Sequence, residues 1–302
     1  MARANERPVA VTAALLRRWP LPQPGDSADK QDRGVAIVIG GAAEVPGALL
    51  LSGIAALRVG AGKLQLAGPR AAATALGVAL PEARVFALGE SGDAFLDRCA
   101  ASRAAECAHG ADAILIGPGM LNENATRGFM DEILGKVSDR PLVIDAFALI
   151  ALRDSRHHFP EGAKVVLTPN HSEMARLTGE KHEVIAGDPL GVANTVSRDL
   201  NALVALKGPE TFIATPSGKV FRYTGGDVGL ATSGSGDVLA GALVGLLARG
   251  ATLEQAAVWA TFLHGSAGNR LAKRIGPLGF LAHELSDELP SLMNQLARKS
   301  AS

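Results

Sequence analysis

Gly229-Leu-Ala-Thr-Ser-Gly-Ser-Gly-Asp-Val-Leu-Ala-Gly241 is a glycine-rich turn that leads directly into an apolar helix, with one carboxylate, Asp237, at the junction. Glycines can adopt backbone angles that are closed to other residues, so the N–H groups of Gly234, Ser235 and Gly236 can converge on one anion. The helix dipole adds roughly half a positive charge at the same point. The stretch therefore predicts a phosphate-binding turn at a helix N-terminus.

The helix that follows is apolar from Val238 to Leu247, so we expect it to be buried and its N-terminus to be held rigidly. An Asp at the start of a helix is often only a cap. The three glycines of the turn and the apolar helix favour another interpretation, in which Asp237 is a catalytic base beside the phosphate.

The composition is that of an ordinary globular protein. The chain has 302 residues, 47% of them hydrophobic, with 30 basic residues against 30 acidic ones. This balance indicates neither a nucleic-acid partner nor a membrane partner. Cys99 and Cys107 lie in a predicted helix, about 12 Å apart along its axis, which is too far for a disulfide. We therefore expect a cytoplasmic protein.

Short apolar runs alternate with helical patterns from residue 35 onward, which predicts an α/β fold with a mainly parallel sheet covered by helices on both faces. We expect one domain over 34–302, preceded by an irregular arm over 1–33 that contains Pro20, Pro22 and Pro24. A hairpin around 216–218 predicts an antiparallel edge. The predicted strands are 35–39, 64–67, 113–116, 142–145, 164–168, 203–206, 211–214 and 220–223. The predicted helices are 47–60, 70–79, 92–109, 125–137, 188–200, 236–249, 252–273 and 278–289.

Several polar or glycine-rich turns follow strands of this predicted sheet. They are Gly40-Gly41, Gly117-Pro118-Gly119, Asp145-Ala146 and Thr168-Pro169-Asn170. Because ligands of open parallel sheets bind at the carboxyl ends of the strands, we expect these turns to meet at one site. Asp145 would then approach substrate or a metal-bound water, although a plain turn residue also fits that position.

Two familiar nucleotide signatures are absent from the sequence. Gly60-Ala61-Gly62-Lys63 resembles the end of a P-loop, but Leu64 replaces the hydroxyl residue and Leu57 replaces the first glycine. The glycines after the first strand lack the spacing of a dinucleotide-binding fingerprint.

Asn170 and Glu173 lie three residues apart at the start of a predicted helix. Such a pair can hold a hydrated Mg²⁺ beside phosphates, but it also fits a structural capping box. Farther along, Lys207, Gly208 and Thr211 surround a Gly-Pro turn that suits the edge of a nucleotide site, or a simple β-turn. His171 is expected at the surface or behind the site, and His264 in the core.

Taken together and in this order, these elements resemble the ribokinase-like superfamily, and most closely the ADP- or ATP-dependent NAD(P)H-hydrate dehydratases. These form the carboxyl-terminal half of many bifunctional repair proteins. The resemblance covers nearly the whole chain after residue 30. It is carried by Arg33–Ala48 with Ala56–Gly62, by Pro81-Glu82, Gly117–Gly119, Leu142–Ala146, Leu167–Pro169 and Leu206–Gly208, and by Gly229–Gly241 and His264–Gly268.

The resemblance implies a ribokinase-like three-layer sandwich and the repair of hydrated NADH or NADPH. The hydroxyl of the damaged nicotinamide ring attacks the terminal phosphate of ADP or ATP, and the phosphate ester is then expelled. Asp237 would accept the hydroxyl proton, while the amides of Gly234 to Gly236 and Mg²⁺ would stabilise the phosphoryl oxygens. Ala48, Gly119, Asp145, Asn170 and Asp237 would border the substrate. Lys207, Gly208, Thr211 and Gly236 would border the nucleotide, and Asn170 with Glu173 the metal.

Three positions depart from the family pattern, because Phe147 replaces an Asp, Asn170 a His and Ser233 a glycine. Two alternatives therefore stay open, a kinase for a small hydroxymethyl or hydroxyethyl compound and a non-catalytic nucleotide-binding paralogue. We expect the NAD(P)H-hydrate epimerase to be a separate protein, because 33 residues cannot form it. A homo-oligomer is the default for such enzymes.

Overall fold

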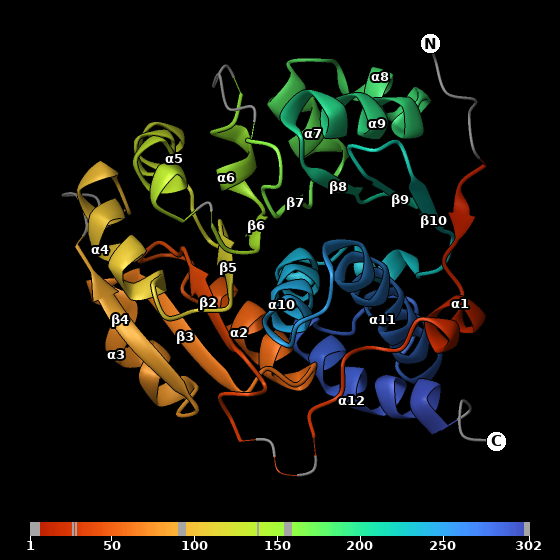
Figure 1. The fold of residues 1–302 in the computed structure, drawn as a ribbon, viewed down its shortest axis with the longest axis horizontal. Helices are drawn as coiled ribbons and strands as arrows, with labels where there is room; N and C mark the ends of the chain where they lie inside the picture. The colour runs from red at the N-terminus through yellow and green to blue at the C-terminus, as the bar shows by residue number, and fades with distance from the viewer. Residues whose placement is uncertain are drawn as a thin grey trace.

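The computed structural model describes residues 7–298 except 26, 28, 90–94, 138 and 154–158. One ten-stranded sheet runs through the molecule in the order β1-β10-β9-β8-β7-β6-β5-β2-β3-β4 (Figure 1). The pairs on both sides of β9 are antiparallel and the other pairs are parallel. The strands are β1 Val9–Ala10, β2 Val35–Ile39, β3 Lys63–Pro69, β4 Ala83–Leu88, β5 Ala113–Ile116, β6 Leu142–Ile144, β7 Val165–Leu167, β8 Leu203–Leu206, β9 Thr211–Ala214 and β10 Val220–Tyr223.

Helices cover both faces of the sheet, and each face has its own hydrophobic core. One core joins the sheet to α1 Ala13–Arg18, α2 Gly47–Arg58, α3 Arg70–Ala79, α10 Ser235–Ala248, α11 Leu253–Arg274 and α12 Ala282–Arg298. The other joins it to α4 Arg98–Ala108, α5 Glu123–Val137, α6 Phe147–Ile150, α7 His171–Thr178, α8 His182–Gly187 and α9 Pro189–Leu200. This three-layer arrangement confirms the predicted fold class.

Helix α10 is the most deeply buried helix next to the sheet, with every residue from Val238 to Ala248 inside the protein. Its glycines allow the backbone of α2 to approach. A Cβ on Gly241 would lie 2.1 Å from the carbonyl oxygen of Ser52, and a Cβ on Gly245 would lie 2.6 Å from that of Ala56. The body of α10 therefore packs closely against α2, and the helix is buried, as the apolar sequence predicted.

The predicted strands and most predicted helices are present within a few residues, and the 216–218 hairpin joins β9 to β10. β4 was not predicted, although it contains the apolar run Val85–Leu88; it is an edge strand and only partly buried. The helix predicted over 92–109 begins at Arg98, capped by Asp97, and residues 92–94 lie outside the described part. The helix predicted over 278–289 begins at Ala282 and continues to Arg298, through Pro290. Cys99 and Cys107 are both free, as expected.

The irregular arm predicted over 1–33 was wrong in part, because it contains β1 and α1. β1 pairs in parallel with β10, and Trp19 stacks on Phe221 at a centroid distance of 6.0 Å. The Trp19 carbonyl accepts hydrogen bonds from Trp259 Nε1 and Gln255 Nε2. These long-range contacts order the segment, and local sequence patterns carry no trace of them. None of the described helices combines the length and apolar character needed to cross a membrane.

Candidate active site

The carboxyl ends of β6, β7 and β8 bring Asp145, Thr168 and Lys207 into contact. Thr168 Oγ1 donates to Asp145 Oδ1 at 2.7 Å, and Lys207 Nζ lies 3.0 Å from the same oxygen. Asp145 is buried, so the ammonium group and the hydroxyl replace the water that its carboxylate has lost. The sequence predicted that these strand ends converge, but it did not predict Thr168 as the hydroxyl partner. A polar residue at the end of an apolar strand was the available signal.

Lys207 is the cation among several carboxylates of this site. Glu173 Oε2 lies 3.7 Å from Lys207 Nζ. The nearby charges of Asp145, Glu173 and Asp237 raise the pKa of Lys207 despite an opposing desolvation effect, which is the largest single influence. Burial raises the pKa of Glu173, while Lys207 opposes that rise. Lys207 therefore stays charged and stabilises the carboxylates around it.

Asn170 and Glu173 form the capping box of α7. Asn170 Oδ1 accepts the N–H of Glu173, and Glu173 Oε2 accepts the N–H of Asn170, both at 2.8 Å. The capping box, which was the structural alternative to a metal site for this pair, is thus present. Within the described residues, no group of three or more His, Cys, Asp or Glu side chains has the arrangement of a metal site. The metal role of the pair stays a prediction.

The N-terminus of α10 has the geometry predicted for the glycine-rich turn. Gly234 is the N-cap with φ +85°, the left-handed conformation that glycine adopts without strain. A Cβ on Gly236 would lie 3.3 Å from Lys207 Nζ, so this turn reaches the Lys207 ammonium group. The positive end of a helix and a cation therefore lie side by side, an arrangement that favours an anion. The N–H of Ser235 donates to the Thr232 carbonyl oxygen at 3.3 Å.

His264 on α11 contacts this turn, which the sequence analysis did not predict. Its Nε2 lies 2.8 Å from Ser235 Oγ and 3.0 Å from the Ser235 carbonyl oxygen. Burial and the charge of Lys207 lower the pKa of His264 to about 4, so the ring is neutral near pH 7. A neutral ring that donates from Nε2 to the carbonyl fixes the orientation of Ser235.

Asp237 lies in the first turn of α10, partly buried. Burial raises its pKa to about 7, and the charges of Asp145 and Glu173 add to the rise, while Lys207 opposes it. A carboxyl group with this pKa can accept and release a proton near neutral pH. The electrostatics therefore support the base role predicted for Asp237.

The residues predicted for the substrate side form a close contact between α2 and the turn after β5. A Cβ on Gly119 would lie 3.1 Å from Ala48 Cβ and 2.8 Å from the Val45 carbonyl oxygen. A Cβ on Gly117 would lie 1.9 Å from the Asp145 carbonyl oxygen, so this turn runs against the end of β6. Glycine is thus required for the close approach of the two backbones.

The residues predicted to border the nucleotide lie at the same edge of the sheet. Gly208 follows Lys207 and is exposed, and Thr211 begins the antiparallel strand β9. A Cβ on Gly208 would lie 2.6 Å from His171 Nε2, a buried atom without a hydrogen-bond partner in the described structure. His171 therefore lies behind the Lys207-Gly208 turn.

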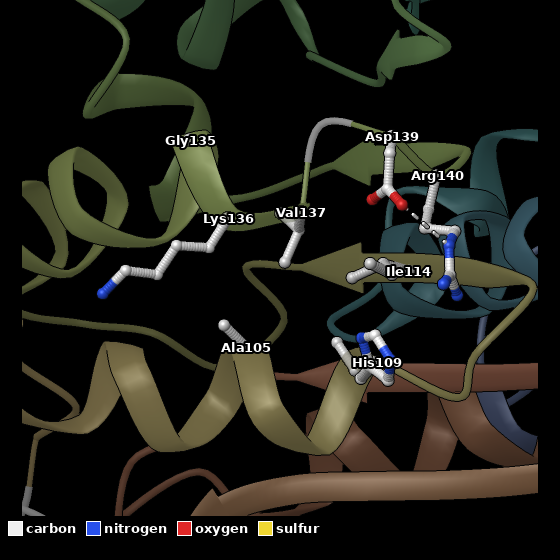
Figure 2. Close-up of a pocket in the computed structure, with 9 residues that line it drawn as sticks. Ala105, His109, Ile114, Gly135, Lys136, Val137, Asp139 and Arg140 are labelled. Carbon is white, nitrogen blue, oxygen red and sulfur yellow. Dashed lines mark hydrogen bonds and ion pairs between the residues drawn. The ribbon is translucent and has the colours of Figure 1, made fainter.

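A separate cavity of about 170 Å³ opens between α4 and α5 (Figure 2). Ala108 and His109 precede β5, and Asp139 and Arg140 precede β6, so the cavity lies at the amino ends of these strands. The candidate active site lies at the opposite ends.

Comparisons with known proteins identify the family of this chain. The family model for NAD(P)H-hydrate dehydratase matches residues 36–291. The chain belongs to the NAD(P)H-hydrate dehydratase family. The ADP-dependent (S)-NAD(P)H-hydrate dehydratase of Xanthomonas campestris is 44% identical over 289 residues, which cover 95% of this chain and 97% of that relative.

Other family members are either single enzymes or parts of longer proteins. The bifunctional NAD(P)H-hydrate repair enzyme Nnr of Moorella thermoacetica is 37% identical, with 95% of this chain matched to 54% of that protein. The ADP/ATP-dependent NAD(P)H-hydrate dehydratase of Bacillus subtilis, co-crystallised with ATP/Mg²⁺, aligns with a TM-score of 0.83 at 28% identity, over 97% of this chain and 100% of that one. The fold is ribokinase-like, as predicted.

Proposed function

We propose that this protein removes water from hydrated NADH or NADPH at the expense of ADP or ATP. The observation that carries the proposal is the position of Asp237, whose pKa is about 7, at the amide-rich N-terminus of α10 and within the field of Lys207. This arrangement combines a base with an anion site in a member of the dehydratase family.

Asp237 serves as the base of the first step. The ring hydroxyl of the hydrate attacks the terminal phosphorus of the nucleotide and its proton passes to Asp237. The bond from this phosphorus to the bridging oxygen breaks, so AMP leaves from ADP, or ADP from ATP. The carbon–oxygen bond of the phosphate ester then breaks with help from the ring nitrogen lone pair, and inorganic phosphate leaves. Loss of a proton from the adjacent ring carbon restores the reduced nicotinamide. The amides of Gly234, Ser235 and Gly236 receive the developing charge on the phosphoryl oxygens.

Lys207 is the cation that we assign to this chemistry. Its ammonium group lies beside Gly236 as well as Asp145, so the same group that stabilises the resting carboxylates can approach a bound phosphate. Ala48, Gly119, Asp145 and Asn170 border the substrate in this proposal, and Gly208 and Thr211 border the nucleotide.

The oxygen donors of the site fit a magnesium ion that is bound to the nucleotide and surrounded by water. Asn170 and Glu173 would hold its waters, since their capping box uses only some of their oxygen lone pairs and Glu173 Oε1 takes no part in it. Bound Mg²⁺ would neutralise charge on the transferred phosphoryl group. The co-crystallisation of the Bacillus subtilis relative with ATP/Mg²⁺ supports this assignment.

The test is the recovery of reduced-nicotinamide absorbance from hydrated NADH and hydrated NADPH, with ADP and ATP supplied separately. We expect recovery with at least one nucleotide, and one phosphate released per molecule restored. Accumulation of a stable phosphate ester of a small alcohol would favour the kinase alternative, and nucleotide binding without any turnover would favour the non-catalytic one. The names of the relatives favour the dehydratase.

The cellular setting is also part of the proposal. We propose a cytoplasmic location, and the free Cys99 and Cys107 are in keeping with a reducing compartment. The bifunctional relatives support an NAD(P)H-hydrate epimerase as a separate partner in the same repair process. A homo-oligomer remains the expected assembly.

A further inference from the structure

Phe147 and Arg176 form a stacked pair beside the candidate active site. Arg176 Cζ lies 4.7 Å from the centroid of the Phe147 ring. Arg176 Nη2 also lies 3.3 Å from Glu123 Oε2, and both side chains of that ion pair are about half exposed, at 46% each. The guanidinium group is therefore oriented on one face by an aromatic ring and remains accessible to a ligand.

The backbone places this pair at the carboxyl edge of the sheet. Ala146 connects buried Asp145 to Phe147, the first residue of α6, and has φ +53° and ψ −132°. Such angles cost about 1–3 kcal/mol in a residue other than glycine and cluster at functional sites. Glu123 begins α5, four residues after Gly119.

The stacked pair continues a row of charges along this edge. Arg176 follows Glu173 by one turn of α7, and Glu173 lies near Lys207. Arg176 shares Glu123 with Arg127, whose Nη2 lies 3.5 Å from Glu123 Oε1. One carboxylate therefore serves two guanidinium groups, so its charge does not fully compensate Arg176.

A cation such as Arg176 beside the reaction centre would favour the binding of an anionic substrate. Asp145 Oδ1 and Glu173 Oε2 lie 3.0 Å and 3.7 Å from Lys207 Nζ, and Asp237 is close enough to act on its charge. Among these four described side chains, three acidic groups share one ammonium group, so the set is negative when all three carboxyls are ionised. A dinucleotide carries a negative diphosphate, and its NADP form carries a further phosphate. Attraction at the rim of the site has to offset repulsion at the centre.

We propose that Arg176, held over Phe147, binds a phosphate group of the hydrated dinucleotide. This inference rests on the proposed function. Phe147 contributes by presenting the guanidinium group without neutralising it, whereas an acidic side chain at position 147 would compete with the substrate phosphate. The phosphate is either the diphosphate common to both substrates or the 2′-phosphate of the NADP form.

The first experiment measures KM and kcat of Arg176→Gln with both hydrates. Loss of a charge-assisted contact predicts a KM increase of about tenfold or more, with kcat changed less than about twofold. An increase for both hydrates identifies the diphosphate, and an increase for hydrated NADPH alone identifies the 2′-phosphate. Unchanged KM for both, in a variant that melts like the wild type, would overturn the proposal.

Arg103→Gln is the control, since Arg103 forms an exposed ion pair with Glu106 on α4 and does not share Glu123 with Arg176. Its KM should stay within about twofold of the wild type, and an effect as large as that of Arg176→Gln would show that the loss of any surface arginine raises KM, which would overturn the proposal. Phe147→Asp is the second variant, and should raise KM without removing Arg176. Phe147→Leu should raise it less.

A binding measurement separates this proposal from the proposed function. The Kd of intact NADPH, followed by nicotinamide fluorescence, should rise about tenfold in Arg176→Gln whether or not the protein turns over a hydrate. If the wild type binds NADPH but repairs neither hydrate, the dehydratase assignment fails while this one survives. If the wild type repairs the hydrates and the Kd is insensitive to Arg176→Gln, the role of Arg176 is refuted and the dehydratase assignment stands.

Discussion

Lys207 Nζ and Asp145 Oδ1 lie 3.0 Å apart and join the carboxyl ends of β8 and β6 across the intervening strand β7. Only 3% of the Asp145 side chain and 17% of the Lys207 side chain are exposed. The desolvation of two charges offsets much of their attraction, so this pair is better suited to positioning and chemistry than to net stability.

Replacement of Lys207 by Met should therefore be costly. The free energy of unfolding should fall by about 3–5 kcal/mol, since a buried carboxylate loses its partner. The pKa of Asp237 should rise further, which would move the activity profile to higher pH. Chemical denaturation and pH–rate measurements check both effects. Lys136→Met removes a more exposed pair with Glu132 and serves as the control, with an expected change below about 1 kcal/mol.

Asp237→Asn should remove turnover while nucleotide binding stays within a few fold of the wild type. Loss of a positioned base typically costs about 10²–10⁴ in rate. In the wild type, log kcat/KM should rise with pH up to about 7 and then level, because the ionised carboxylate of the free enzyme is the active form. A turnover rate of Asp237→Asn equal to that of the wild type, or a wild-type rate that does not change with pH near 7, would contradict this role.

The same group predicts a stability effect of known sign. Because the folded-state pKa of Asp237 is raised, the folded protein binds this proton more tightly than the unfolded chain, and stability falls as pH rises from about 4 to 7. Asp237→Asn removes the buried charge and should melt at a higher temperature than the wild type above pH 7. That advantage should shrink between pH 7 and pH 4. Melting curves over this range give the answer.

His264→Ala should weaken nucleotide binding, because Ser235 loses the group that orients it. His264→Gln, which can still donate to the Ser235 carbonyl oxygen, should restore part of the affinity. The pKa of His264 is lowered to about 4 in the folded protein, against about 6.5 in the unfolded chain. The neutral ring therefore contributes stability above pH 6.5, and this contribution is lost as the pH falls to about 4. Isothermal titration with ADP, together with acid unfolding of both variants, measures these changes. Equal affinities in the Ala variant and the wild type would rule out the positioning role.

Gly241→Ala should destabilise the protein, since the new methyl group would lie 2.1 Å from the Ser52 carbonyl oxygen and force α10 away from α2. The expected loss is about 1–3 kcal/mol, accompanied by lower activity because the N-terminus of α10 carries the site. Gly135→Ala is the control. Gly135 lies in α5 with nothing within 4 Å of a new Cβ, so Ala should stabilise by up to about 1 kcal/mol. Urea denaturation compares the two variants.

The fold was largely predictable because its central strands are short, fully buried apolar runs. β2, β5 and β8 coincide with their predicted ranges for this reason. β1 and α1 were not predictable from the sequence. They are held in place by the pairing of β1 with β10 and by the contacts of Trp19 with α11, and each of these contacts joins residues more than two hundred positions apart in the chain. Local patterns record no such pairing.

The candidate site was predictable where function leaves a local signature. The glycines before Asp237 and the polar residues at strand ends were found in this way. The contact between His264 and Ser235 was not predicted, because a histidine within an apolar helix looks like a core residue and its sequence context does not show that it contacts the neighbouring turn. The pKa of Asp237 also depends on burial and on charges from other segments, which only the folded chain brings together.

Strand β1 has a consequence for solubility. Without it, β10 would present an unpaired strand margin, which is a template for intermolecular sheet growth. The Trp19 carbonyl, in the same N-terminal segment, accepts hydrogen bonds from α11. This segment therefore covers the outer edge of the sheet, and it contains none of the candidate catalytic residues. Truncation of residues before Trp19 should therefore promote aggregation while the catalytic residues remain intact.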